Sequence, residues 1–227
     1  MQIDSNLGMH LVRATESAAL SSGRWMGRGD KNACDQAAVD AMRFALQGVP
    51  MNGVVVIGEG EKDDAPMLYT GDRVGTGEGP ELDIAVDPVE GTALVAEGRP
   101  GAISVVAGAE RGALYQWQGI AYMNKIVVGE RASGVIDIEA PVGVNIRNVA
   151  RALGKRVADI TVVVLDRPRH KELIDQIRAT GARIKLILHG DVAAGVMTSV
   201  EDPPADILMG IGGAPEGVIT ACALKCT

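Results

Sequence analysis

Apolar positions in the first half of the chain follow two different spacings. Leu7, Leu11, Ala14 and Ala18 recur every three or four residues, which predicts a first helix that ends near Gly23. In contrast, the continuous run Val-Val-Val-Ile at 54–57 is typical of a buried strand. The other elements expected here are a helix over 35–46, a strand over 82–86, and β-like stretches over 102–107 and 125–128. We expect these two stretches to add antiparallel strands to one mixed N-terminal sheet.

From residue 145 onward, helical and strand patterns alternate. The expected helices cover 145–153, 171–180, 192–200 and 215–224, and the expected strands cover 160–165, 184–188 and 207–209. Such alternation indicates βαβ units and a parallel sheet. The fold class expected is therefore α/β, with an N-terminal domain over 1–140 and a C-terminal α/β domain over 141–227.

Composition supports a globular protein and narrows the functions open to it. The 227 residues are 47% hydrophobic but only 3% aromatic, and they include 29 glycines. A core of this size is built from aliphatic side chains. The formal net charge of −7 argues against a general nucleic-acid binder, which would carry a basic patch. Small anionic substrates remain compatible with this charge, because bound cations can invert the local potential.

The cysteine pattern and the absence of long apolar stretches indicate in which cellular compartment the protein is expected. Cys34, Cys222 and Cys226 form no C-x-x-C pair, which favours buried or incidental thiols in a reducing environment. The chain opens without a charged segment followed by an apolar one, and it has no run of about 18 apolar residues. We expect a soluble, cytoplasmic protein with no membrane partner.

Acidic residues directly follow two of the expected strands. Glu59 and Glu61 come after the first apolar run, and Asp87, Glu90 and Thr92 come after the second, in the sequence Asp-Pro-Val-Glu-Gly-Thr. Ligand sites form at strand ends in α/β sheets, and gathered carboxylates repel one another unless a cation is bound. The pattern therefore predicts a metal site. The alternative is a pair of solvated acidic turns in which Thr92 caps a helix.

Other candidate residues carry weaker signals. Asp35 follows a basic loop and could be a ligand, although an Asp there is often a helix cap, and Lys31 could be a solvated charge. Arg167 and Arg169 follow a strand and suit phosphate recognition, unless they form a simple basic turn.

A glycine-rich turn over 210–217 leads into the last helix and places Glu216 in its first turn. This turn could direct backbone N–H groups at a phosphate, or it could be a tight structural turn. The histidines at 10, 170 and 189 lack zinc-ligand spacing.

Several stretches together resemble the class II fructose-1,6-bisphosphatases, within the lithium-sensitive, metal-dependent sugar-phosphatase superfamily. The matching stretches are WMGRGDKNACDQAAVDAMR, VVVIGEGEKDDAPMLY, DIAVDPVEGT, YMNKIVVG, LDRPRH, GDVAAG and GIGGAPEG, and they cover nearly the whole chain. The resemblance implies a layered α/β/α sandwich. It also implies Mn²⁺ or Mg²⁺ as cofactor, because the ligands are oxygen-rich.

The resemblance also assigns roles to individual residues. The implied metal ligands are Asp35, Glu59, Asp87, Glu90 and Glu216. The implied substrate-binding residues are Glu90, Gly91, Thr92, Tyr122, Arg167, Pro168, Arg169, Gly190, Asp191 and Gly213, to which we add Lys31 as a candidate. Glu59, Glu61 and Thr92 are our catalytic candidates, which would orient or deprotonate the attacking water.

The activity that this resemblance implies is phosphoric monoester hydrolysis. The expected substrate is fructose 1,6-bisphosphate, which loses its 1-phosphate to give fructose 6-phosphate. One alternative is a dual enzyme that also accepts sedoheptulose 1,7-bisphosphate, and another is an inactive sugar-phosphate- or metal-binding protein. An inositol-phosphate or nucleotide-phosphate phosphatase is less favoured. A homo-oligomer, either a dimer or a tetramer, is expected.

Two departures from the family pattern affect these expectations. The family usually carries an acid where this chain has His189, which concerns one sugar-hydroxyl contact. Family members also continue well beyond residue 217. We therefore expect an incomplete C-terminal domain, whose sheet has an exposed edge.

Overall fold

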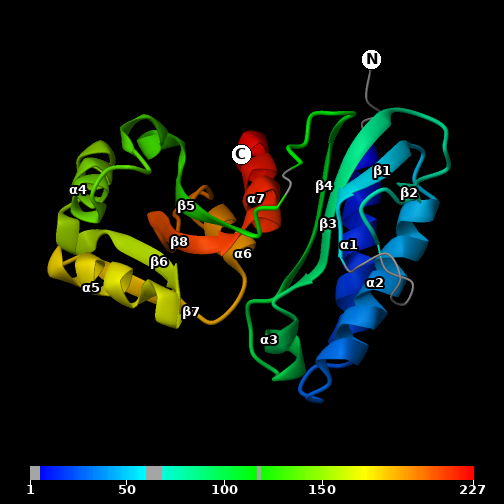
Figure 1. The fold of residues 1–227 in the computed structure, drawn as a ribbon, viewed down its shortest axis with the longest axis horizontal. Helices are drawn as coiled ribbons and strands as arrows, with labels where there is room; N and C mark the ends of the chain where they lie inside the picture. Colours follow the sequence, from blue (N-terminus) through cyan, green and yellow to red (C-terminus); the bar gives the residue numbers. More distant parts are fainter. Residues whose placement is uncertain (1–5, 60–67, 117–118) are drawn as a thin grey trace. The chain divides into compact units, whose positions relative to one another are not determined.

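The structure is a computed structural model that describes residues 6–59, 68–116 and 119–227. The chain forms two compact units, Met1–Gln118 and Gly119–Thr227, each of which is described by itself (Figure 1). This division lies earlier in the chain than the boundary expected at residue 140. Each unit contains a four-stranded mixed sheet and helices, so the α/β fold class is confirmed.

The described elements follow the expected order with a few additions. Unit 1 contains α1 (Leu7–Gly23), α2 (Lys31–Gln47), β1 (Asn52–Ile57), β2 (Arg73–Val74), β3 (Glu81–Glu90), α3 (Thr92–Ala96) and β4 (Ile103–Glu110). The first half of unit 2 contains β5 (Tyr122–Val128), η1 (Glu130–Val135), α4 (Val142–Leu153), η2 (Val157–Asp159) and β6 (Thr161–Leu165). Its second half contains η3 (Pro168–His170), α5 (Lys171–Ala179), β7 (Arg183–Ile187), α6 (Asp191–Val196), β8 (Ile207–Gly213) and α7 (Ala214–Cys226).

The sheet of unit 1 has the strand order β2-β1-β3-β4. β1 and β3 are parallel, whereas β2 and β4 pair antiparallel to their neighbours, which confirms the expected mixed sheet. α1 packs against β3 and β4, and α2 packs against β2 and β3. Their buried aliphatic side chains form one core with the sheet, which includes Ala14, Met42, Leu46, Val55 and Ile84.

The start of α2 corrects an expectation about Asp35. The side chain of Asp30 accepts a hydrogen bond from the backbone N–H of Ala33 at 3.0 Å, so Asp30 is the N-cap and the helix begins at Lys31. Asp35 lies inside the helix rather than at its start. The helix-cap alternative for Asp35 is therefore wrong, because the earlier aspartate already fills that role.

Strand β3 continues past residue 86, where its end was expected. Its pairing with β4 changes register between Asp87 and Glu90, the segment that contains Pro88. Because proline has no N–H to donate, an irregularity of the ladder accommodates it. Gly91 follows with φ +87°, a left-handed conformation that favours glycine, and α3 begins at the next residue.

The sheet of unit 2 has the strand order β5-β8-β6-β7. β6 is parallel to both β7 and β8, which confirms the βαβ-type second half. β5 pairs antiparallel with β8 over its whole length. The expectation that residues 125–128 add a strand to the first sheet is therefore wrong, because β8 offers this strand an edge in the second unit.

Unit 2 is a three-layer sandwich, as the alternating side chains of β6 show. Val162 and Val164 pack in one cluster with buried residues of α4 and α5, including Ile146 and Ile177. Val163 points to the opposite face and packs with residues of α6 and β8. The two faces of the sheet thus carry different helix layers.

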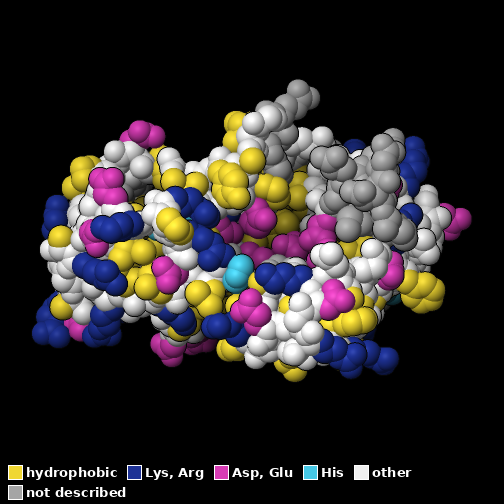
Figure 2. Space-filling view, turned by 60° about the horizontal axis from the view of Figure 1, so that its bottom comes forward, with side chains coloured by type: hydrophobic (Ala, Val, Ile, Leu, Met, Phe, Trp, Pro, Cys, Tyr) yellow, Lys and Arg dark blue, Asp and Glu magenta, His cyan; other side chains and the backbone are white. Residues whose placement is uncertain are grey.

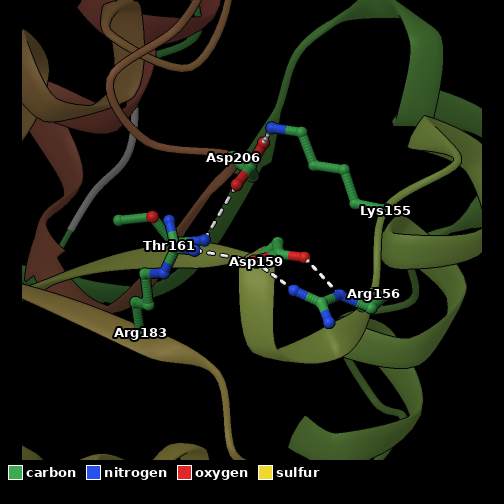
Figure 3. Close-up of polar contacts among 6 residues, drawn as sticks. All are labelled: Lys155, Arg156, Asp159, Thr161, Arg183 and Asp206. Atoms are coloured by element: carbon green, nitrogen blue, oxygen red, sulfur yellow. Dashed lines mark hydrogen bonds and ion pairs between the residues drawn. The ribbon is translucent and has the colours of Figure 1, made fainter.

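A buried carboxylate joins the starts of two parallel strands in unit 2 (Figure 3). The Oδ2 atom of Asp206 accepts a hydrogen bond from the Thr161 N–H at 2.8 Å, and the Asp206 N–H donates to the Thr161 carbonyl at 2.8 Å. The second carboxylate oxygen, Oδ1, lies 2.6 Å from Lys155 Nζ. This network holds β6 and β8 in register.

None of the helices in the described part of the chain is long and apolar enough to cross a membrane.

Candidate functional site

The acidic residues of unit 1 follow neighbouring strand ends. β1 and β3 run parallel, and Ile57 pairs with Ala85. Glu59 and Asp87 each lie two residues beyond this pair, so they follow the same edge of the sheet. Both residues are partly buried. The two residues thus follow the ends of neighbouring strands, and their role as ligands stays a prediction.

Asp35 is joined to the same segment through Thr92. The Thr92 hydroxyl lies 3.3 Å from Asp35 Oδ1 and 3.1 Å from the Val89 carbonyl, and both are acceptors for its single proton. Burial raises the pKa of Asp35, while the hydrogen bond from Thr92 opposes this shift. Glu90, two residues before Thr92, is only 5% exposed.

Some predicted residues of unit 1 are not joined to this group. Lys31 is exposed at the first residue of α2, and Glu61 lies outside the described residues. Among the described residues, no three His, Cys, Asp or Glu side chains are grouped closely enough to hold a metal ion. The five-carboxylate ligand set therefore stays a prediction.

The predicted residues of unit 2 gather at one edge of its sheet. β6, β7 and β8 are parallel, so their carboxyl ends lie on the same side. Arg167 follows β6, Gly190 follows β7, and Gly213 ends β8. Tyr122, at the start of the antiparallel β5, pairs with Gly213 and so joins this edge.

Arg169 is held against two of these strands. Its Nε and Nη2 atoms donate to the Ile211 carbonyl at 3.1 and 2.9 Å, and its guanidinium lies 5.3 Å from the centre of the Tyr122 ring. This position allows a cation–π interaction. Arg169 therefore fixes both the β8 backbone and the exposed tyrosine.

Arg167 and His189 are also in contact. Arg167 Nη2 donates to His189 Nδ1 at 3.0 Å, which makes Nδ1 an acceptor. His189 thus presents a lone pair to the arginine, at the position where the resemblance leads us to expect an acid. Pro168 lies between the two arginines, at the first position of η3.

Glu216 lies in the first turn of α7 and faces the end of β8. A Cβ atom at Gly213 would overlap its Oε2 atom, so the glycine makes room for the carboxylate. Oε2 is buried and has no hydrogen-bond partner among the described residues. A buried carboxylate oxygen of this kind is a suitable ligand for a hard cation.

Sequence reasoning missed His170. Its Nε2 accepts the Ile211 N–H at 2.7 Å, so Nδ1 carries the proton that is donated to the Leu165 carbonyl at 2.8 Å. Both ring nitrogens therefore serve the backbone.

Sequence reasoning also missed Lys125, which forms a buried ion pair with Asp191 at 2.7 Å. The only signal in the sequence was a lysine that opens the apolar run Ile-Val-Val.

Figure 2 shows how charge is distributed over the surface of the unit that contains α4 and α5. Lys and Arg side chains are dispersed over its face in this view. Asp and Glu side chains lie between them in the same view, so the charges of both signs are mixed on this face. Two of the cations proposed to bind phosphate, Arg167 and Arg169, belong to this unit.

Comparisons with known proteins relate the chain to one family. Residues 5–227 match the family described as bacterial fructose-1,6-bisphosphatase, glpX-encoded. The chain is 48% identical over 219 residues to fructose-1,6-bisphosphatase 1 class 2 of Escherichia coli (strain K12), and equally identical to fructose-1,6-bisphosphatase class 2 of Shigella flexneri. Each match covers 96% of this chain and 65% of the relative's length.

A solved structure described as an extragenic suppressor from Pyrococcus furiosus is also similar, with a TM-score of 0.45 and 12% sequence identity. This similarity covers 95% of this chain and 82% of that chain.

Proposed function

The chain belongs to the glpX-encoded bacterial fructose-1,6-bisphosphatase family, and we propose on this basis that it hydrolyses fructose 1,6-bisphosphate to fructose 6-phosphate and phosphate. The family match over residues 5–227 is the observation that carries this proposal. The chain spans 65% of the length of the curated relatives that it matches, so the activity of those proteins is proposed for it. The reaction class is phosphoric monoester hydrolysis.

The family is metal-dependent, and the proposed ligands are Asp35, Glu59, Asp87, Glu90 and Glu216. Two observations support this set. Burial raises the pKa of Asp35, and the Oε2 atom of Glu216 is buried without a described hydrogen-bond partner. A cation would stabilise both as carboxylates. Because all five ligands are oxygen donors, we propose Mn²⁺ or Mg²⁺ rather than zinc. When bound, such a cation would neutralise phosphate oxygens and lower the pKa of a water molecule.

The chain's own residues would then orient and deprotonate the attacking water. The Thr92 hydroxyl donates its proton to Asp35 or to the Val89 carbonyl, which leaves its lone pairs available to accept a hydrogen bond from water. Glu59 or Glu61 is the proposed proton acceptor. The reaction requires no covalent phosphoenzyme, because water attacks phosphorus directly.

Residues at the strand ends of unit 2 would bind the substrate. Arg167 is the proposed contact to the non-reacting phosphate, because its guanidinium lies beside a neutral histidine rather than an acid. Arg169 would hold Tyr122 in place beside the sugar phosphate. The remaining proposed contacts are Lys31, Glu90, Gly91, Thr92, Pro168, Gly190, Asp191 and Gly213.

Phosphate release from purified protein tests the proposal. We expect release from fructose 1,6-bisphosphate that requires Mn²⁺ or Mg²⁺ and that falls by about a hundredfold or more in Glu90→Gln. Asp40→Asn is the matched control, because Asp40 is an exposed acid of α2 that hydrogen-bonds Gln36. This variant should keep wild-type activity.

Other outcomes of the same assay separate the alternatives. Equal turnover of sedoheptulose 1,7-bisphosphate would identify a dual bisphosphatase, whereas preferred turnover of an inositol phosphate would contradict the proposed substrate. Binding of fructose 1,6-bisphosphate without metal-dependent release would overturn the proposed activity and favour a binding protein. A homo-oligomer in the cytoplasm belongs to the same proposal, and light scattering would measure its subunit number.

A further inference from the structure

Unit 2 contains a buried ion pair beside its candidate substrate residues. Lys125 Nζ lies 2.7 Å from Asp191 Oδ2, and the two side chains are only 6% and 7% exposed. Lys125 comes from the middle of β5, and Asp191 is the first residue of α6. A buried ion pair is often no more stabilising than an apolar pair of similar size, so stability alone is a weak reason for its presence.

The second oxygen of the Asp191 carboxylate is a separate observation. Oδ1 is buried and has no hydrogen-bond partner in the described part of the chain. Leaving such an acceptor unpaired costs stability. Lys125 satisfies one oxygen and neutralises the charge, while the other oxygen keeps its capacity to accept hydrogen bonds. The carboxylate is thus held in one orientation with one acceptor left for a ligand.

Gly212 makes the space that this pair needs. A Cβ atom at Gly212 would overlap Asp191 Oδ2 and would lie 2.9 Å from Lys125 Nζ. The ion pair therefore packs directly against the end of β8, and a side chain at position 212 would displace the Asp191 carboxylate.

We propose that Lys125 and Gly212 are positioning residues, which hold Asp191 so that its Oδ1 accepts a hydrogen bond from a sugar hydroxyl. An ionised carboxylate only accepts hydrogen bonds, so its partner must be a donor such as a hydroxyl and not a phosphate oxygen. The inference deepens the proposed function and rests on it, because Asp191 is one of the proposed substrate contacts.

Binding measurements on the whole chain without divalent metal test this inference apart from turnover. Isothermal titration calorimetry would compare fructose 1,6-bisphosphate with inorganic phosphate, which has no sugar hydroxyls. We expect Lys125→Met to weaken binding of the bisphosphate roughly tenfold or more, and binding of phosphate by less than about threefold. Gly212→Ala should have the same effect, since its methyl group would displace the carboxylate.

Lys155→Met is the matched control. Lys155 forms another short lysine–aspartate pair in this unit, 2.6 Å from Asp206, and it is not among the proposed substrate residues. This variant should lower the Tm and leave both dissociation constants unchanged. If Lys125→Met behaves in the same way, the pair is structural only and the inference is overturned. Equal weakening of both ligands would also overturn it, because Lys125 would then act on the phosphate.

Asp191→Asn provides a second test if Lys125→Met does not fold, because it keeps the shape of the side chain. It should weaken bisphosphate binding selectively, and unchanged binding would refute the inference. Wild-type protein that binds the bisphosphate but does not hydrolyse it with Mn²⁺ would contradict the proposed function and leave this inference standing. Wild-type protein that does not bind the bisphosphate would overturn the inference.

Discussion

At the scale of single residues, Asp35 shows how a proposed ligand affects the folded chain. Burial raises its pKa, so the folded state binds a proton more readily than the unfolded state does. The stability of the metal-free chain should therefore fall as the pH rises through this raised pKa. Above it, the ionised carboxylate is a cost that a neutral side chain would avoid.

We predict that Asp35→Asn raises the Tm of the metal-free chain at pH 7 by about 1–3 °C. The difference from wild type should shrink as the pH is lowered, because Asp35 then becomes protonated. In the presence of Mn²⁺ the wild type should have the higher Tm, because only the wild type has a carboxylate at this position to bind the cation. Scanning fluorimetry over a pH series from neutral into the acidic range measures all three effects. A variant that is less stable than wild type at pH 7 without metal would contradict this account.

The three free cysteines should differ strongly in reactivity. Cys34 is fully buried, and its pKa is raised by burial and by the charges of Asp35 and Asp30. Burial also raises the pKa of Cys222, whereas Cys226 is exposed. A raised pKa lowers the fraction of reactive thiolate.

We predict that iodoacetamide at pH 8 labels Cys226 first, and Cys34 at least about a hundredfold more slowly, because labelling of Cys34 requires opening of the fold. Peptide mass spectrometry would follow each site over time. In urea the three rates should converge. Rapid labelling of Cys34 in the native chain would show that α2 is not packed as described.

At the scale of elements, the hydrogen-bond network of Asp206 fixes the parallel pairing of β6 and β8 (Figure 3). Asp206→Ala would leave the Thr161 N–H without its acceptor and would release Lys155. We predict a loss of about 2–3 kcal/mol in the free energy of unfolding, which corresponds to a fall in Tm of roughly 4–12 °C.

The control for this prediction is the variant Asp159→Ala, at a residue that is also labelled in Figure 3. Asp159 forms ion pairs with two exposed arginines, Arg156 and Arg183, each at 2.7 Å. Exposed ion pairs contribute little, so this variant should change the Tm only slightly. Urea denaturation would compare the two variants. Equal losses of unfolding free energy in the two variants would mean that the buried network of Asp206 contributes no more than the exposed ion pairs.

Local patterns predicted most elements but not all of their partners. The alternation after residue 145 was sufficient for the parallel strands, because βαβ order fixes their direction. It was insufficient for β5, which is antiparallel and could have joined either sheet. The N-cap of α2 was also misplaced, because Asp30 and Asp35 are both acids in a polar stretch and only the hydrogen bond to Ala33 distinguishes them.

The same limit applies to the candidate site. The positions of Glu59 and Asp87 at strand ends could be predicted from the sequence, because each follows an apolar run. Lys125 could not, because its partner Asp191 lies 66 residues away and only the fold brings them together. The sequence pattern identifies chemistry at strand ends, whereas long-range pairs depend on tertiary packing.

At the scale of the whole molecule, the chain divides into two units that each have their own buried core. Four of the proposed metal ligands belong to the first unit, and Glu216 belongs to the second. The proposed activity depends on these carboxylates binding cations. Activity assays alone would test this indirectly, because many defects abolish turnover.

Anomalous diffraction from crystals grown with Mn²⁺ measures the ligand set directly. The account predicts at least one manganese peak with oxygen atoms of Asp35, Glu59, Asp87, Glu90 and Glu216 within about 2.5 Å of bound metal. Manganese bound elsewhere, with these five side chains on separate surfaces, would contradict the proposed hydrolysis.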